Sequence, residues 1–149
     1  MPTPVDIIHT GTIGAPIDKV FALLTEPPRI PEWLPGCSAI VPKDGVMKVG
    51  ARFHLEMGSR GNRVEIEIID FQPPRTFGWV EHRRRAGNKT FLKLDYQGGS
   101  TRITFKLMWQ AVSFRSWLLG QFYRRRDAWR IFNGMLQNLR KALMKGDRK

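Results

Sequence analysis

Residues 102–143 read RITFKLMWQAVSFRSWLLGQFYRRRDAWRIFNGMLQNLRKAL, and the spacing of apolar residues changes within this stretch. The first six residues alternate between polar and apolar, which predicts a strand with one buried face. Further on, apolar residues recur at alternating steps of four and three, which predicts one stripe of a helix running to about Met144. The apolar members of this stripe are Leu118, Phe122, Trp129, Phe132, Leu136, Leu139 and Leu143.

The same alternation with a period of two occurs repeatedly upstream of this stretch, from Cys37 onward. It is clearest in residues 51–57, 64–68, 77–79 and 92–96. Short segments rich in Gly, Pro and Asn separate these runs, namely residues 58–62, 73–74, 86–88 and 98–99. Alternating strands with short connections predict an antiparallel meander of hairpins with one face buried and one face in water.

The N-terminal part supplies one more strand and two short helices. Residues 3–13 are rich in Val, Ile and Thr, as strands are. Pro16 and Asp18 then favour the start of a helix, and further prolines leave space for a single helical turn near residues 29–34. The one-sided sheet must be covered, and the final helix is the only element long enough to do so. We therefore expect an α+β fold of about seven strands in one domain, residues 1–149.

Four segments in this order and spacing resemble the START-like (SRPBCC) superfamily, and most closely its branch of polyketide cyclases, dehydrases and lipid-transport proteins. The segments are APIDKVF (15–21), PEWLPG (31–36), FQPPRTFGW (71–79) and GGSTRITF (98–105). The resemblance implies a helix-grip fold, in which a curved sheet wraps around a long C-terminal helix. It also implies a cavity between sheet and helix for lipids, polyketides or other apolar molecules, and it names no reaction.

Composition narrows the classes of protein and partner. The 25 Lys and Arg residues exceed the 13 Asp and Glu residues, so the net charge is +12, which favours anionic partners. The single cysteine, Cys37, forms no intrachain disulfide and is expected to be a small packed residue. The three histidines fall on different strands, so we expect neither a metal site nor a cofactor. The N-terminal residues do not resemble a signal peptide, and a cytoplasmic location is expected.

The inward-facing positions of the strands and helix are the candidate lining of the cavity, for which we expect a volume of roughly several hundred Å³. The apolar candidates are Phe53, Leu55, Ile66, Trp79, Leu92, Leu94, Phe105, Leu107, Phe122 and Trp129. Glu81, Tyr96 and Arg125 are the candidate polar anchors of a ligand. Trp33 is interpreted either as a lid over this cavity or as a plug in the core between helix and sheet.

Two charged residues interrupt the apolar faces. Glu81 shares the parity of Phe77 and Trp79, and Arg125 lies in the apolar stripe of the final helix. Because a buried charge is costly without a partner, the two side chains are predicted to approach each other or a ligand. The alternative is that the strand ends before Glu81 and that Arg125 extends into solvent. Tyr96 has the inward parity and could offer its hydroxyl to the same space, or simply pack.

The basic residues cluster at positions that could form a rim around the cavity mouth. They flank two hairpin tips and lie in the first half of the last helix: Arg60, Arg63, Arg83, Arg84, Arg85, Lys89, Arg124 and Arg126. A cationic rim suits an anionic amphiphile or an anionic lipid surface. The alternative is a charged face that serves solubility alone.

Three functions remain open from the sequence. The first is binding or carriage of a small hydrophobic or amphipathic ligand. The second is an enzyme of the cyclase/dehydrase kind, with Glu81 and Tyr96 as the acid or base candidates. The third is a basic module that docks on a membrane or on nucleic acid. Nucleic acid ranks last because the aromatics follow the inward pattern instead of lying among the basic residues. The sequence leaves the oligomeric state undetermined.

Overall fold

The computed structural model describes residues 3–82, 88–111 and 114–147, and the side chains of residues 7–82, 88–108 and 128–144. The strands are β1 (Thr3–Ile13), β2 (Cys37–Val41), β3 (Arg52–Met57), β4 (Asn62–Gln72), β5 (Thr76–Glu81), β6 (Lys89–Gln97) and β7 (Ser100–Ala111). The helices are α1 (Ile17–Thr25), the 3-10 turn η1 (Pro27–Arg29), α2 (Ile30–Trp33) and α3 (Phe114–Asp147).

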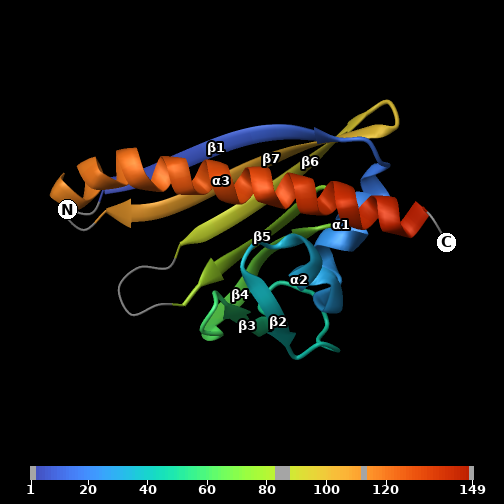
Figure 1. Cartoon of the computed structure of the whole chain (residues 1–149), viewed down its shortest axis with the longest axis horizontal. Helices are drawn as coiled ribbons and strands as arrows, with labels where there is room; N and C mark the ends of the chain where they lie inside the picture. The colour runs from blue at the N-terminus through green and yellow to red at the C-terminus, as the bar shows by residue number, and fades with distance from the viewer. Residues whose placement is uncertain (1–2, 83–87, 112–113, 148–149) are drawn as a thin grey trace.

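The seven strands form one antiparallel sheet in the order β1-β7-β6-β5-β4-β3-β2. Every pair except β1 with β7 joins strands that are neighbours in the chain, as a meander of hairpins requires. The long helix α3 lies across the sheet, and α1 and α2 lie near its C-terminal half (Figure 1). The predicted helix-grip fold with a curved seven-stranded sheet is confirmed.

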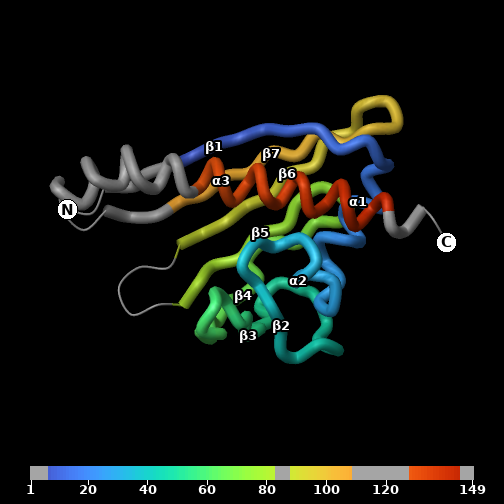
Figure 2. The backbone as a smooth tube through the Cα atoms, in the orientation of Figure 1, coloured from blue at the N-terminus to red at the C-terminus, as the bar shows by residue number. Residues whose placement is uncertain are grey.

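Prolines set the ends of the short helices. Pro16 precedes α1, Pro27 and Pro28 open η1, and Pro31 lies in the first turn of α2. Proline suits a first helical turn because its missing N–H would have no partner there. Figure 2 shows α2 and the described part of α3 side by side, and Asn138 Nδ2 donates a hydrogen bond of 3.3 Å to Trp33 O between them. This contact helps to set the distance between the two helices.

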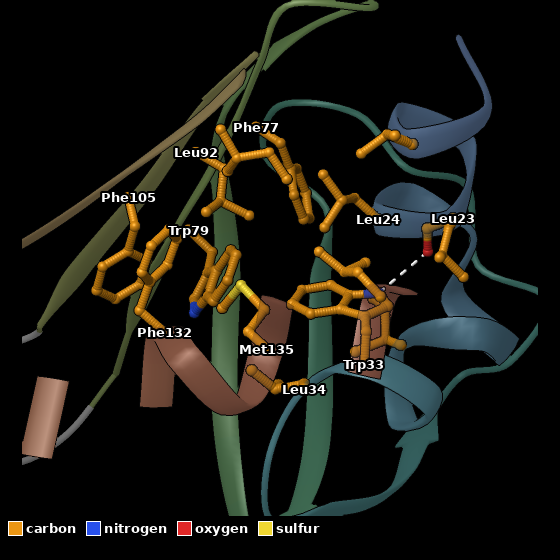
Figure 3. Packing of buried hydrophobic residues seen from close by; sticks show 14 of the residues in the cluster. Leu23, Leu24, Trp33, Leu34, Phe77, Trp79, Leu92, Phe105, Phe132 and Met135 are labelled. Atoms are coloured by element: carbon orange, nitrogen blue, oxygen red, sulfur yellow. Dashed lines mark hydrogen bonds between the residues drawn. The ribbon is translucent and has the colours of Figure 1, made fainter. Parts of the chain in front are cut away.

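The core between sheet and helices is continuous and aromatic. Phe105, Leu92 and Phe77 are paired in register across β7, β6 and β5, and each is at most 2% exposed. Phe132 of α3 stacks on Phe105 with ring centres 5.3 Å apart (Figure 3). It also stacks on His9 of β1, with ring centres 6.0 Å apart. These ring contacts therefore join α3 to two neighbouring strands, β7 and β1.

The buried side of α3 differs in part from the predicted stripe. In its described part the buried residues are Ala128, Phe132, Met135, Leu136, Leu139 and Ala142. Trp129 is 53% exposed, so its assignment to the cavity lining is wrong. Successive residues of a helix are about 100° apart, so a face centred on Ala128 and Phe132 turns Trp129 toward solvent. The helix also approaches β1 closely, because a Cβ at Gly11 would come within 2.5 Å of Leu136 Cδ1.

Candidate functional site

A small apolar pocket lies between α2 and the strands β3, β4 and β5. Its lining is Ile30, Trp33, Leu34, Leu55, Ile66, Phe77 and Trp79. Its volume is about 10 Å³, which is about the space that one water molecule needs. This pocket is therefore far smaller than the cavity of several hundred Å³ expected from the sequence. A wholly apolar wall cannot hold water well, so the pocket favours apolar groups.

Trp33 is fixed at the α2 side of this pocket. Its side chain is 1% exposed, and Nε1 donates a hydrogen bond of 3.0 Å to Leu23 O (Figure 3). Its ring lies 6.3 Å from the ring of Trp79, centre to centre. A side chain held by a hydrogen bond and by packing on all sides acts as a plug in the core, which was one of the two interpretations of Trp33. The structure does not show it as a lid.

Apart from Trp129, which is exposed, the predicted apolar lining residues and Arg125 fall into three groups. Leu55, Ile66 and Trp79 line the pocket. The neighbouring core contains Phe53, Leu92, Leu94 and Phe105, all buried, and Leu107, partly buried. The side chains of Phe122 and Arg125 lie outside the described residues.

Three pocket residues were missed by the sequence analysis. Phe77 has the same parity as Trp79 on β5, so the alternation could have identified it. Ile30 and Leu34 belong to the proline-rich segment around α2, where no periodic pattern extends far enough to show which side chains face inward. Short helices give little sequence information because one turn contains too few residues to define a face.

Tyr96 does not reach the interior. Its side chain is 71% exposed, so its assignment as a polar anchor is wrong. Tyr96 pairs with Thr101 near the tip of the β6–β7 hairpin, whereas the pairing of β5 with β6 extends only to Lys93. A hydrogen bond of 2.7 Å from Leu94 N–H to Arg75 O is the last backbone contact on this side, and after Leu94 the inward parity no longer implies burial.

Glu81 lies at the end of β5, opposite Ile66 of the pocket lining. Its backbone N–H donates a hydrogen bond of 3.0 Å to Asn88 O, so the strand pairing continues through this residue. The carboxylate oxygen Oε2 is shielded from solvent, as an inward orientation requires. Arg125 belongs to α3, and its pairing with Glu81 stays a prediction.

The described basic residues of the predicted rim are exposed at one end of the sheet. Arg60 and Arg63 lie at the β3–β4 hairpin, and Lys89 begins β6. Because neighbouring strands are antiparallel, the β3–β4 hairpin, the β5–β6 connection and the end of β7 before α3 share this end (Figure 1). Arg83, Arg84 and Arg85 lie outside the described residues, as do the side chains of Arg124 and Arg126.

The outer face of the sheet carries a network of charged side chains. Arg52 contacts Glu65 and Glu67 at 3.2 Å, and His82 Nε2 lies 3.0 Å from Glu67 Oε1. His54 is also exposed on this face. Within the described part of the chain, no three His, Cys, Asp or Glu side chains gather as ligands of a metal would.

Cys37 should resist alkylation in the folded protein. Burial raises the pKa of its thiol, and the nearby negative charge of Glu56 adds to this effect. Because the thiolate is the nucleophile, a raised pKa and poor access both slow the reaction. We expect iodoacetamide at neutral pH to modify Cys37 far more slowly in buffer than in denaturant, measured by intact mass. Equal rates under both conditions would show that β2 opens readily.

Comparison with known proteins identifies the family. The sequence pattern of the family described as "Polyketide cyclase / dehydrase and lipid transport" matches residues 5–143. The chain belongs to this family. No curated protein matches it. Within the described residues, no helix is both long and apolar enough to cross a membrane.

Solved structures show the same fold at low sequence identity. Protein MLL2253 from Mesorhizobium loti is 18% identical with a TM-score of 0.72, and the match covers 95% of this chain and 98% of that one. Ara h 8.0201 is 12% identical with a TM-score of 0.73, and coverage is 96% and 99%. DynU16, a putative protein in the dynemicin biosynthetic locus, is 17% identical with a TM-score of 0.71. That match covers 95% of this chain and 48% of DynU16.

Proposed function

We propose that the protein binds a small hydrophobic or amphipathic molecule on the inner face of its sheet, with the pocket beside α2 as the innermost end of the site. The observation that carries the proposal is the pocket wall, in which Trp33, Phe77 and Trp79 supply aromatic surface and no polar side chain takes part. Membership of a family named for polyketide cyclases and lipid transport supports the same class of ligand.

A ligand of ordinary size requires more room than the pocket offers. Along β5, the inner face continues from Trp79 to Glu81. The carboxylate oxygen Oε2 of Glu81 is shielded from solvent, so this part of the inner face ends in a polar group. A ligand with an apolar body near Trp79 and a polar group near Glu81 would fit this gradient. Native mass spectrometry of the purified protein would detect a molecule that remains bound.

Filling the pocket should block binding without removing the fold. We expect Ile66→Phe to lose the fluorescence enhancement of the anionic amphipathic probe anilinonaphthalene sulfonate, because the larger ring occupies the pocket where the probe's aromatic part would bind. The matched control is Ile68→Phe, two residues along β4, where the side chain is fully buried but outside the pocket lining. Both changes should cost about 1–3 kcal/mol of stability as overpacking does. Equal probe binding by both variants would contradict the assignment of the pocket.

An enzymatic role has one supporting observation, the shielded carboxylate of Glu81 on the inner face. A carboxyl group held away from water is suited to donate or accept a proton. With Tyr96 exposed, Glu81 is the one remaining candidate of the two that the sequence suggested. Turnover of a polyketide substrate that is lost in Glu81→Gln, with probe binding retained, would favour catalysis over carriage.

A further inference from the structure

The connection between β2 and β3 exposes an unusual number of apolar side chains. We name residues 41–51 the valine loop, because Val46 is 71% exposed, Val49 60% and Val41 43%. Lys43 and Lys48 alternate with these valines and are also exposed. Single exposed apolar residues are common, but here three exposed valines lie within nine residues of one another, and concentrated exposed apolar surface is a feature of interaction sites.

The backbone contacts of the valine loop keep these side chains outside. Gly45 N–H donates a 3.3 Å hydrogen bond to Pro42 O, and Gly50 N–H donates a 2.8 Å hydrogen bond to Ile68 O on β4. Met47, between the exposed valines, packs against the core. The loop is thus tied to β4 through Gly50 and to the core through Met47, and folding does not bury Val46 or Val49.

The valine loop also touches the wall of the core next to the pocket. Gly45 lies so close to Phe53 that a Cβ there would come within 2.6 Å of the ring. Phe53 pairs with Ile66, which lines the pocket. A partner surface that contacts the loop would therefore lie beside one wall of the proposed binding site. Docking by the loop is independent of the proposed function, and only a role of docking in ligand transfer rests on it.

Charge indicates what kind of surface the loop fits. Lys43 and Lys48 outnumber Asp44, and the whole chain carries a net charge of +12. Aliphatic side chains bordered by lysines are suited to the interface of an anionic bilayer, where the valines enter the acyl boundary and the ammonium groups meet phosphates. The loop contains no aromatic residue on which a nucleic-acid base could stack.

We propose that the valine loop docks the protein onto the surface of anionic lipid membranes. The loop lies at the β2 edge of the sheet, at the lower border of the view in Figure 1, and α3 does not cover it there. Two valines and two lysines give weak binding, because a small apolar insertion and a few charges contribute modestly. Reversible contact of this strength suits a protein that collects or delivers a membrane-soluble ligand.

Sedimentation with vesicles tests the proposal. The probes are vesicles of phosphatidylcholine alone and of phosphatidylcholine mixed with phosphatidylglycerol, with no added ligand. We expect the wild type to bind the mixed vesicles and the double variant Val46→Ser/Val49→Ser to bind them about tenfold more weakly, since it loses the apolar insertion. Lys43→Gln/Lys48→Gln should weaken binding and reduce its dependence on salt.

The matched control is Ile8→Ser, which changes an equally exposed aliphatic residue (59%) on the outer face of the sheet. This variant should bind the mixed vesicles as the wild type does. Equal binding by the wild type and the valine variant would overturn the proposal and leave the other basic residues as the source of any affinity. Ile66→Phe should also dock normally, so that loss of docking and loss of the ligand site can be told apart.

Discussion

Trp33→Ala should lower the free energy of unfolding by about 3–5 kcal/mol, as removal of a fully buried aromatic side chain does. Trp33 is 1% exposed and contacts Trp79, and its indole N–H donates to Leu23 O. The change would open a cavity between α1, α2 and the sheet, and it would leave the carbonyl of Leu23 without this donor. Urea denaturation followed by far-ultraviolet circular dichroism measures the loss without relying on tryptophan fluorescence.

Two further variants separate the contributions to this loss. Trp33→Phe keeps an aromatic ring but removes the N–H donor, so it should cost less than Trp33→Ala and at least the roughly 1 kcal/mol of one hydrogen bond. Trp129→Ala is the matched control, because Trp129 is 53% exposed on α3 and should change stability by about 0.5 kcal/mol or less. A similar loss at both tryptophans would mean that Trp33 is not the plug that the structure indicates.

The fold was predictable from the sequence because its strands and long helix have different apolar periods. Alternation over several residues identified β3, β4, β6 and β7 and their buried faces, since each strand has one neighbour layer and one solvent face. The spacing of apolar residues located the long helix in the sequence. It did not predict the rotation of the helix about its own axis, which decides the side chains that face the sheet. The rotation depends on which small residues allow close approach, as Gly11 does for Leu136, and spacing alone does not contain this information.

The site was predictable only where a regular strand supplies it. Leu55, Ile66 and Trp79 follow from parity, and the structure places them together in one pocket. Tyr96 has the same parity on β6, yet it is exposed because β5 no longer pairs with β6 at that point. The α2 side of the pocket depends on how a proline-rich segment folds back over the sheet, which is a tertiary arrangement without a local sequence pattern.

Removing the charge of Glu81 is expected to cause the second large loss in the free energy of unfolding. Glu81 lies on the inner face with Oε2 shielded from solvent, and the sequence predicts Arg125 as its partner. The buried positions of α3 follow steps of four and three, and one further step of three back from Ala128 reaches position 125. If the two charges meet, Glu81→Gln and Arg125→Met should each cost about 1–3 kcal/mol, since a lone shielded charge keeps its desolvation cost.

The double variant Glu81→Gln/Arg125→Met should recover part of the loss, because it leaves neither charge without a partner. The control is the same cycle on the outer face with Glu65→Gln and Arg52→Met, whose side chains lie 3.2 Å apart. Arg52 is 58% exposed, so the coupling there should stay within about 1 kcal/mol. Chemical denaturation of the wild type and the six variants gives both coupling energies. Additive losses in the Glu81 cycle would show that Arg125 is not its partner and that Glu81 faces another group inside the protein.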